Sequence, residues 1–307
     1  MNYQTIKKAI RSRMFWSLVF NKLHSFVPLY VIRNRNIRFQ NKICKSYYKC
    51  AKKYRRIIEE GVSCSEFSQK SDKIWICWFQ GEENAPDLVK ACIESVRRSM
   101  PEKDIVVLTD MNIEQYTDFP EYIIKKRQQG IISAAHFSDL LRVELLCRHG
   151  GMWIDSTVLC TADGTPQYIK DSDFFVYKQL NTINLDEDPI VCSSWLISSV
   201  SNQKILLLTR KLLWTYWKKA KRVENYFLFH IFLSLSARRY GELWEEVPFY
   251  NNHCPHELFR ELEKEYTEKK WQRIVEKSDF HKLSHHITFS TEKRTIYNHI
   301  IDKYSSR

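Results

Sequence analysis

The sequence has little glycine and proline, no pair of cysteines in a Cys-x-x-Cys spacing, and no long apolar run. Only 7 Gly and 8 Pro occur in 307 residues, which excludes collagen-like and low-complexity chains. Hydrophobic residues make up 44% and aromatic residues 14%, and this composition excludes intrinsic disorder. A chain of this length corresponds to about two domains, or to one α/β domain with additions.

The nine cysteines are scattered rather than grouped. They stand at positions 44, 50, 64, 77, 92, 147, 160, 192 and 254. Several lie in apolar stretches, where a thiol behaves as a small core residue, and the pattern indicates a reducing compartment. The spacing of His253, Cys254 and His256 matches no zinc pattern, so we expect no zinc site there.

The positive charge is confined to the start of the chain. Residues 1–60 have 15 Lys and Arg against Glu59 and Glu60, a net charge of +13. The other residues have 33 basic and 34 acidic side chains, so the formal charge of +12 belongs to this segment. Such an excess indicates an anionic partner: nucleic acid, a membrane surface or a phosphate-bearing ligand.

Two short apolar runs, 14–20 and 26–32, lie within this basic segment. They are interrupted by polar residues and Pro28, so neither approaches the roughly 20 residues of a membrane span. Basic residues on both sides and the lack of a small-residue cleavage site make a poor signal peptide. The pattern favours a helix lying on an anionic membrane surface. A helical arm packed on the body and a nucleic-acid contact are the alternatives.

From residue 73 the pattern is that of an α/β fold with a right-handed, mainly parallel sheet. We expect strands at 73–79 and 104–110, a helix at 86–100 and an interrupted helical region at 112–129. A further helix should end at Gly150-Gly151, before a strand that runs to Asp155. Further strands are expected at 174–178 and 193–198, helices near 203–219 and 224–239, and helices in the polar tail. The predicted organisation is a basic helical extension, 1–70, and one domain, 71–307.

Polar residues that could bind a ligand or take part in catalysis flank Gly150-Gly151. Ser138, Asp139 and Arg142 precede it on a helix, and Asp139 and Arg142, three residues apart, share one face. Asp155, Ser156 and Thr157 follow the next strand, at the sheet edge where ligands of open parallel sheets bind. Together they suit a polyhydroxyl ligand and a metal-bridged phosphate. The plain alternative is an Asp–Arg pair on a helix surface and an aspartate in a turn.

The segment SAAHFSDLLRVELLCRHGGMWIDSTV, 133–158, resembles the core of sugar transferases that carry a DXD motif, most closely the capsular polysaccharide synthesis group. The resemblance extends from Ile74 to about Ser199. It implies a GT-A-type nucleotide-sugar-binding fold and a retaining hexosyltransferase. That enzyme would transfer a sugar, from a UDP-sugar, to a hydroxyl of a polysaccharide or lipid-linked oligosaccharide in capsular or surface polysaccharide biosynthesis.

The resemblance also implies roles for individual residues. Asp139 and Arg142 would hold sugar and ribose hydroxyls, and Asp155 would act as the first acid of the DXD element and contact the metal; these three are the expected catalytic residues. Trp78, at the end of the first strand, would lie against the nucleobase; a core position is its alternative, as expected for Trp75. Donor contacts are further expected from Ser138, Ser156, Thr157, Trp195, Lys282 and His285.

The DXD element departs from its pattern, because Thr157 stands where the second acid is expected. A neutral oxygen is a weaker ligand for a hard cation. Mg²⁺ or Mn²⁺ held by Asp155 and the diphosphate is the expectation, and a dispensable metal is the alternative.

Candidates in the second half are less specific. Ser194-Trp195 resembles a step that borders the sugar pocket, with core packing as the alternative. His230 is expected to be a buried histidine rather than a site residue. Lys282, His285 and His286 lie in a tail that could cover the diphosphate and neutralise the leaving group.

The sequence therefore predicts a cytoplasmic transferase held at the inner face of the cell membrane through residues 1–60, without nucleic acid as a partner. The alternatives are a nucleic-acid-binding protein that uses the basic arm, and a transferase fold that has lost catalysis.

Overall fold

The structure is a computed structural model, and it describes residues 29–64, 68–179, 189–286 and 294–305. Side chains are described from residue 37 onward. The apolar run 14–20 and part of the run 26–32 lie outside the described residues.

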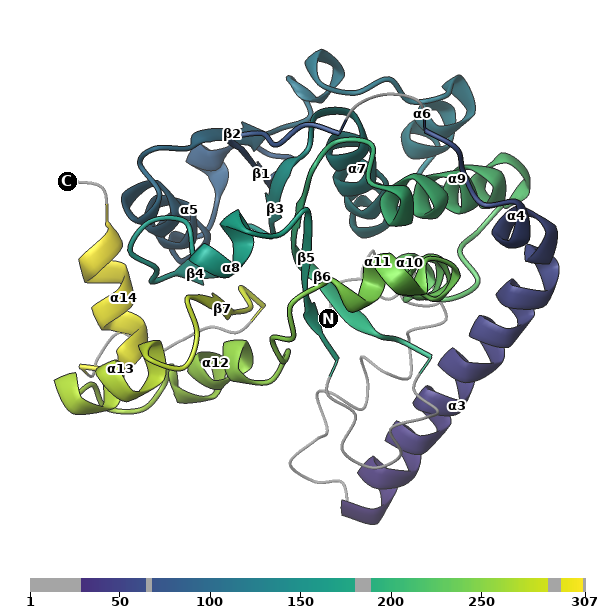
Figure 1. The fold of residues 1–307 in the computed structure, drawn as a ribbon. Coiled ribbons are helices and arrows are strands. Elements are labelled where there is room, and N and C mark those ends of the chain that lie inside the picture. Colours follow the sequence, from purple (N-terminus) through teal and green to yellow (C-terminus); the bar gives the residue numbers. More distant parts are fainter. Residues whose placement is uncertain (1–28, 65–67, 180–188, 287–293, 306–307) are drawn as a thin grey trace.

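A five-stranded sheet forms the centre of the molecule (Figure 1). Its order is β2 (Asp104–Leu108), β1 (Lys73–Cys77), β3 (Gly151–Ile154), β6 (Cys192–Ser199) and β5 (Phe174–Lys178). The pairs β1–β2 and β1–β3 are parallel, and β6 is antiparallel to both β3 and β5. Four strands therefore run in one direction and β6 in the other. The expected mainly parallel α/β sheet is present, with β6 as its exception.

Alternate residues of the strands face two hydrophobic clusters on opposite sides of the sheet. In β1, Trp75 belongs to one cluster, and Ile74 and Ile76 belong to the other. The first cluster contains side chains of α7 (Ala134–His149), α9 (Lys204–Lys219) and α10 (Leu228–Arg239). On the other side lies α5 (Asp87–Ser99). Trp75 is fully buried, which agrees with the core position expected for it.

Helix α7 begins and ends where local chemistry sets its limits. The hydroxyl of Ser133 caps its first turn by accepting from the backbone N–H of His136, and Arg148 and His149 stand in its last turn. Gly150 and Gly151 follow with φ angles of 67° and 93°, a region in which glycine is unstrained. The chain therefore reverses at once into β3, and residues of α7 come to lie beside the end of that strand.

A second, two-stranded sheet brings the tail of the chain to the end of β3. Strands β4 (Val158–Cys160) and β7 (Phe280–Lys282) are antiparallel, and Val158 pairs with Lys282. The backbone N–H of Leu283 donates to the carbonyl of Thr157 at 2.8 Å. This pairing fixes Lys282 next to residues 155–157, from which it is far apart in sequence.

The remaining helices surround this centre. They are α6 (Glu121–Gln128), α8 (Gln167–Lys170), α11 (Gly241–Glu245), α12 (Glu257–Glu261), α13 (Glu268–Val275) and α14 (Ile296–Tyr304), with short 3-10 turns at Glu82–Asn84, Ile113–Gln115 and Cys254–His256. The helical tail expected from the sequence is thus present, although it also contains β7.

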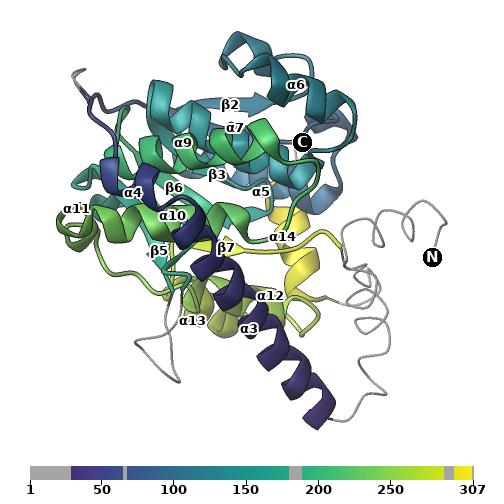
Figure 2. The same ribbon diagram turned by 90° about the vertical axis from the view of Figure 1, so that its right-hand side faces the viewer.

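Helix α3 (Leu29–Lys53) and the short α4 (Arg55–Glu60) lie against α10, and α3 extends away from the body (Figures 1 and 2). The phenol of Tyr47 accepts from Arg238 Nη1 at 2.8 Å, and the ring of Tyr54 meets Phe232 edge to face at 5.3 Å. The described half of the expected extension is therefore helical and partly packed on the body; the domain boundary at residue 70 stays a prediction.

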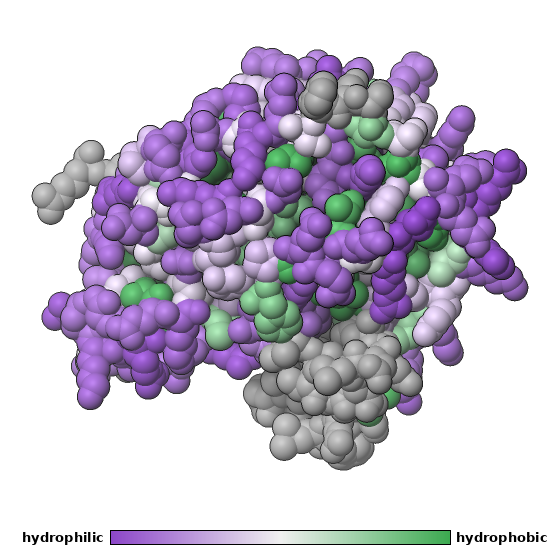
Figure 3. Space-filling view, viewed as in Figure 1, coloured by the Kyte–Doolittle hydropathy of each residue, from purple (hydrophilic) through white to green (hydrophobic). Residues whose placement is uncertain are grey.

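The surface in Figure 3 is mostly hydrophilic, with hydrophobic residues scattered over it. None of the described helices has the length and apolar content needed to cross a membrane.

Candidate active site

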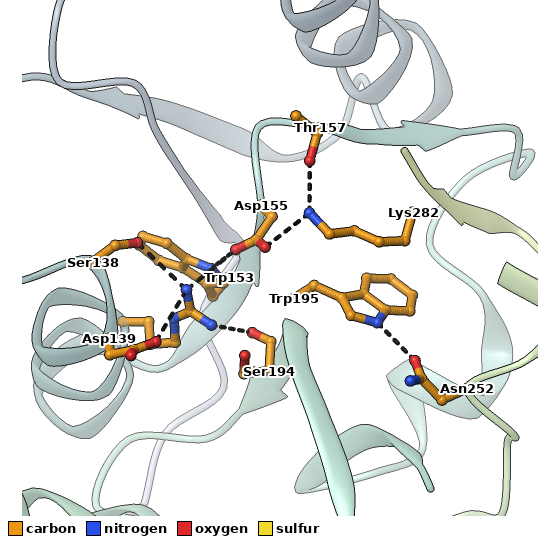
Figure 4. A network of polar contacts seen from close by, with 10 residues as sticks. Ser138, Asp139, Trp153, Asp155, Thr157, Ser194, Trp195, Asn252 and Lys282 are labelled. Atoms are coloured by element: carbon orange, nitrogen blue, oxygen red, sulfur yellow. Dashed lines mark hydrogen bonds and ion pairs between the residues drawn. The ribbon is translucent and has the colours of Figure 1, made fainter. Parts of the chain in front are cut away.

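A polar cluster that includes Ser138, Asp139, Asp155 and Lys282 lies beyond the end of β3 (Figure 4). Arg142 makes the contacts that join it. Its side chain is only 6% exposed, so the alternative of a surface ion pair does not apply. Nη1 donates to the carbonyl of Ser194 at 2.6 Å, and Nη2 donates to the hydroxyl of Ser138 at 3.4 Å. The same Nη2 lies 3.5 Å from Asp139 and 3.3 Å from Asp155. One guanidinium thus links α7, β6 and the end of β3.

Both oxygens of Asp155 have donors. Oδ1 accepts from the indole of Trp153 at 2.9 Å and from Arg142, and Oδ2 accepts from Lys282 Nζ at 3.0 Å. Burial raises the pKa of this carboxyl, but Lys282 and Arg142 outweigh that effect and hold the pKa below its ordinary value. Asp155 is therefore ionised at neutral pH.

Lys282 links Asp155 to Thr157. Its ammonium donates to Asp155 Oδ2 and to the Thr157 hydroxyl at 2.6 Å. Thr157 is buried, whereas the Lys282 and Asp155 side chains are 22% and 24% exposed, so solvent reaches the bridge. Ser156, the middle residue of the element, makes no side-chain hydrogen bond to a described residue.

Asp139 differs from Asp155 in its electrostatics. Burial, together with the charge of Asp155, raises the pKa of Asp139 to about 7 against the opposing effect of Arg142. Burial also raises the pKa of Tyr226, and the charges of Asp139 and Asp155 add to that effect. Since Tyr226 is half exposed, it lies at the mouth of this side of the cluster.

Trp195 forms a wall of the site. Its carbonyl accepts from the N–H of Asp155 at 2.8 Å, and its indole N–H donates to Asn252 Oδ1 at 2.7 Å. Tyr177 stacks on the indole, with centroids 4.6 Å apart. Trp195 is 5% exposed, so its packing and its place beside Asp155 coexist.

Trp78 and His285 lie together at the edge of the cluster. Their rings meet edge to face at 5.2 Å, and His286 lies 4.0 Å from His285. Burial lowers the pKa of His285, with further lowering from His286 and Lys282. The indole N–H of Trp78 is buried and has no hydrogen-bond partner among the described residues. The nucleobase contact expected for Trp78 stays a prediction.

His230 is partly buried beside the cluster rather than part of it. Its ring packs between Phe227 and Phe229, and burial lowers its pKa to about 3. Arg142 lies 5.4 Å from the ring centre of Phe229 and contributes to the low pKa. His230 is thus neutral at physiological pH, and it is partly buried where the sequence predicted a buried histidine.

A cavity of about 450 Å³ is lined in part by Tyr177, whose ring stacks on Trp195. Its walls include Tyr168, Tyr250, Asn251 and Asp279. Tyr168 and Tyr250 stack at 4.0 Å, and the Tyr168 hydroxyl donates to Asp279 at 2.9 Å. The segments that bound it also serve the polar cluster: Asn252 follows Asn251, and Lys282 lies three residues after Asp279.

The residues present do not fit a divalent cation. A hard cation prefers several oxygen ligands, and here Asp155 is the single carboxylate of the element, with both oxygens engaged. The described residues contain no group of three or more His, Cys, Asp or Glu side chains placed to share a metal. A cation at Asp155 Oδ2 would also lie close to the Lys282 ammonium. Two positive unit charges about 4 Å apart repel each other by about 4 kcal/mol at an effective dielectric constant near 20.

The structure brings together most of the predicted site residues. A continuous set of contacts joins Ser138, Asp139, Arg142, Asp155, Thr157, Trp195 and Lys282. Sequence reasoning missed Trp153, Tyr177 and Asn252. Strand periodicity could have identified Trp153, since residues two apart share a face, whereas nothing in the sequence linked Asn252 to Trp195.

Comparison with known proteins identifies the family of this chain. The model of the capsular polysaccharide synthesis protein family matches residues 28–300. The chain belongs to this family. The match covers the sheet, α3 and the tail that supplies Lys282, so the family domain includes nearly all the elements described above.

The chain is also similar to individual proteins. It is 34% identical over 96 residues to the O-glycosyltransferase braB of Annulohypoxylon truncatum, over 28% of this chain and 23% of that protein. The chain thus matches under a quarter of that relative. The solved structure of PaToxG glycosyltransferase aligns with 13% identity and a TM-score of 0.38, over 79% of this chain and 95% of that chain.

Proposed function

We propose that this capsular polysaccharide synthesis protein is a glycosyltransferase with a GT-A-type fold that uses a nucleotide-sugar donor, most simply a UDP-sugar. The acceptor is a hydroxyl of a polysaccharide or lipid-linked oligosaccharide, and the reaction belongs to capsular or surface polysaccharide biosynthesis. The observation that carries the proposal is the cluster of Asp139, Arg142, Asp155 and Lys282 at the carboxyl end of β3.

This cluster suits a nucleotide sugar for two reasons. Ionised Asp155 and the largely buried Asp139 offer acceptors to sugar or ribose hydroxyls, and Arg142 fixes both carboxylates in place. Lys282 adds a partly exposed cation at the same edge, where the charge of a diphosphate develops as the sugar leaves. A surface ion-pair network would need neither the buried arginine nor the long-range contact with the tail.

Substitution Asp155→Asn tests the assignment. The amide keeps the shape of the side chain but removes the charge that orients Lys282 and Arg142, so we expect donor hydrolysis to fall about 100-fold or more. Hydrolysis and thermal shift, recorded with a panel of UDP-, GDP- and other nucleotide sugars, measure this loss of activity.

The control is Asp171→Asn, since Asp171 is exposed and binds only the Gln167 amide at 2.7 Å. This variant should behave as the wild-type protein does. Full activity in the Asp155 variant, or no response of the wild-type protein to any donor, contradicts the proposal and favours a fold that has lost catalysis.

Hexosyl transfer with retention of configuration is part of the proposal and comes from the family resemblance. The anomeric proton signal of the product, recorded by NMR before mutarotation, distinguishes retention from inversion.

For the acceptor we propose the cavity lined in part by Tyr177. It has an aromatic wall, formed by stacked Tyr168 and Tyr250, and polar groups at Asn251 and Asp279, the combination that suits the apolar and hydroxylated faces of a sugar ring. Because Tyr177 also stacks on Trp195, the cavity and the donor cluster share a wall.

Substitution Tyr250→Ala removes the exposed half of that aromatic wall. We expect transfer to methyl glycosides or oligosaccharides to fall about tenfold or more while donor hydrolysis stays unchanged. The matched control is Phe249→Ala, because Phe249 is 63% exposed and does not line the cavity. Equal loss in both variants, or loss of hydrolysis as well, counts against this acceptor site.

We further propose that the protein is peripheral on the inner face of the cell membrane. One side of α3 contains Arg38, Lys42, Lys45 and Lys52. It supports this location, because it is exposed and opposite the side that packs on the body.

A further inference from the structure

The Lys282 ammonium lies between the first and third residues of the DXD-like element, Asp155 and Thr157. Its Nζ lies 3.0 Å from Asp155 Oδ2 and 2.6 Å from Thr157 Oγ1. In a DXD element the residues at these two positions would face a shared divalent cation; here they face an ammonium. The neutral Thr157, which stands where the second acid is expected, and the ammonium of Lys282 are therefore in direct contact.

The lysine is held in place by the fold and not by chance proximity. It ends β7, which pairs with β4 directly after Thr157, and the Leu283 N–H donates to the Thr157 carbonyl at 2.8 Å. Backbone pairing on both sides of the lysine fixes its Cα opposite Val158. The side chain can thus reach Asp155 and Thr157 with little loss of conformational freedom on binding a ligand.

The ammonium retains a donor for a ligand. It has three N–H groups, of which Asp155 and Thr157 accept two, and the side chain is 22% exposed. No other described residue accepts from it. Asp155 also orients Lys282 through the 3.0 Å contact between its Oδ2 and the ammonium.

We infer that Lys282 takes the place of the divalent cation in binding the donor diphosphate, so that the enzyme needs no metal. The inference rests on the proposed function. As the bond between the sugar C1 and the diphosphate oxygen breaks, its electron pair stays on the diphosphate, beside the ammonium. The acceptor oxygen forms the new bond to C1, and its proton passes to solvent.

Binding of UDP to the full-length protein, measured by calorimetry with Mn²⁺ or with a chelator, tests this. We expect similar affinity in both conditions for the wild-type protein. Lys282→Met should weaken UDP binding about tenfold or more, the loss of one charge-assisted hydrogen bond, and leave uridine binding unchanged because uridine has no phosphate. Lys282→Arg should recover part of the affinity.

Two further variants make the result decisive. Lys264→Met removes an exposed lysine that pairs with Glu261 at 2.6 Å, and it should bind UDP as the wild-type protein does. The double variant Thr157→Asp with Lys282→Ala recreates two acids without the lysine, and its UDP binding should become dependent on Mn²⁺.

The outcomes separate this inference from the proposed function. UDP binding that needs Mn²⁺ in the wild-type protein, or that is unchanged in Lys282→Met, overturns the role of the lysine. If neither UDP nor GDP binds to the wild-type protein in either condition, the proposed function itself fails, and the role of the lysine fails with it.

Discussion

Asp139 and Asp155 share one arginine, yet their pKa values shift in opposite directions. Asp155 also has Lys282 and the Trp153 indole as partners, so its charged form is favoured despite burial. Asp139 has only the 3.5 Å contact with Arg142 against the same burial, and its pKa rises to about 7. The two carboxylates contact the same guanidinium, yet they differ in charge because Asp155 has additional hydrogen-bond donors.

This difference predicts a pH dependence of stability. Asp139 has a pKa near 3.8 when the chain is unfolded and about 7 when it is folded. Between these values the folded state binds more protons, so stability falls as the pH rises through this window, by about 1.4 kcal/mol for each unit of pKa difference. Above pH 7 the full loss remains.

The substitution Asp139→Asn removes this titration. We expect the variant to gain stability relative to the wild-type protein at about pH 8, and to gain little at about pH 4. Urea unfolding at the two pH values measures the difference. An identical stability change at both would mean that the Asp139 carboxyl does not titrate in this range. The glycosyl-transfer activity of the variant should fall in either case.

At the scale of elements, the glycine pair between α7 and β3 determines the site geometry. Gly150 ends the helix, and Gly151 starts the strand with φ 93°. A Cβ at Gly151 would overlap the carbonyl oxygen of Lys73 in the neighbouring strand. The close approach of β1 and β3, and with it the position of Asp155, therefore depends on the absence of a side chain at Gly151.

Substitution Gly151→Ala should lower the free energy of unfolding by about 2 kcal/mol or more, through backbone strain and the overlap with Lys73. The control is Gly164→Ala, which also has a positive φ, 80°, but no atom within 4 Å of the added Cβ. That variant should show only the strain, roughly 1 kcal/mol. Thermal or urea unfolding compares them, and equal effects would exclude the overlap as a cause.

The connection of distant segments could not be predicted from element patterns. Strand and helix periodicity placed β1, α5, β2, α7 and β3 within a few residues of their observed limits. It could not give the direction of β6, because a buried strand has the same pattern whether it runs parallel or antiparallel. Nor could it pair β4 with β7, two strands of three residues each that lie far apart in sequence.

At the scale of the whole molecule, α3 resolves how the basic segment meets the body. One side of it, continued by Tyr54, is buried: Ile43, Tyr47 and Cys50 follow each other at helical spacing. The opposite side is basic and exposed, and it contains Arg38, Lys42, Lys45, Lys49 and Lys52. The packed arm and the membrane-facing helix, alternatives for the sequence, are therefore compatible in one helix.

Replacement of Arg38, Lys42, Lys45 and Lys52 by Gln should weaken binding to vesicles of phosphatidylglycerol and phosphatidylcholine, by about 1 kcal/mol for each charge that lies near the surface. Lys49 is kept because it pairs with Glu224 at 2.7 Å. Sedimentation with vesicles measures the change, and neutral phosphatidylcholine vesicles are the control. Unchanged sedimentation, or tighter binding to RNA than to vesicles, would contradict the membrane location. Deletion of residues 1–60 is a poorer test, since it removes core residues such as Tyr47.

The sequence by itself determined the α/β class, and the family resemblance of 133–158 pointed to Asp139, Arg142 and Asp155, because these residues lie within one continuous segment. The tertiary structure decided what surrounds Asp155. Lys282, Trp195 and Asn252 come from separate segments, and only strand pairing and packing bring them to the same edge of the sheet. The charge that opposes Asp155, and with it the proposed independence from metal, follows from that long-range pairing.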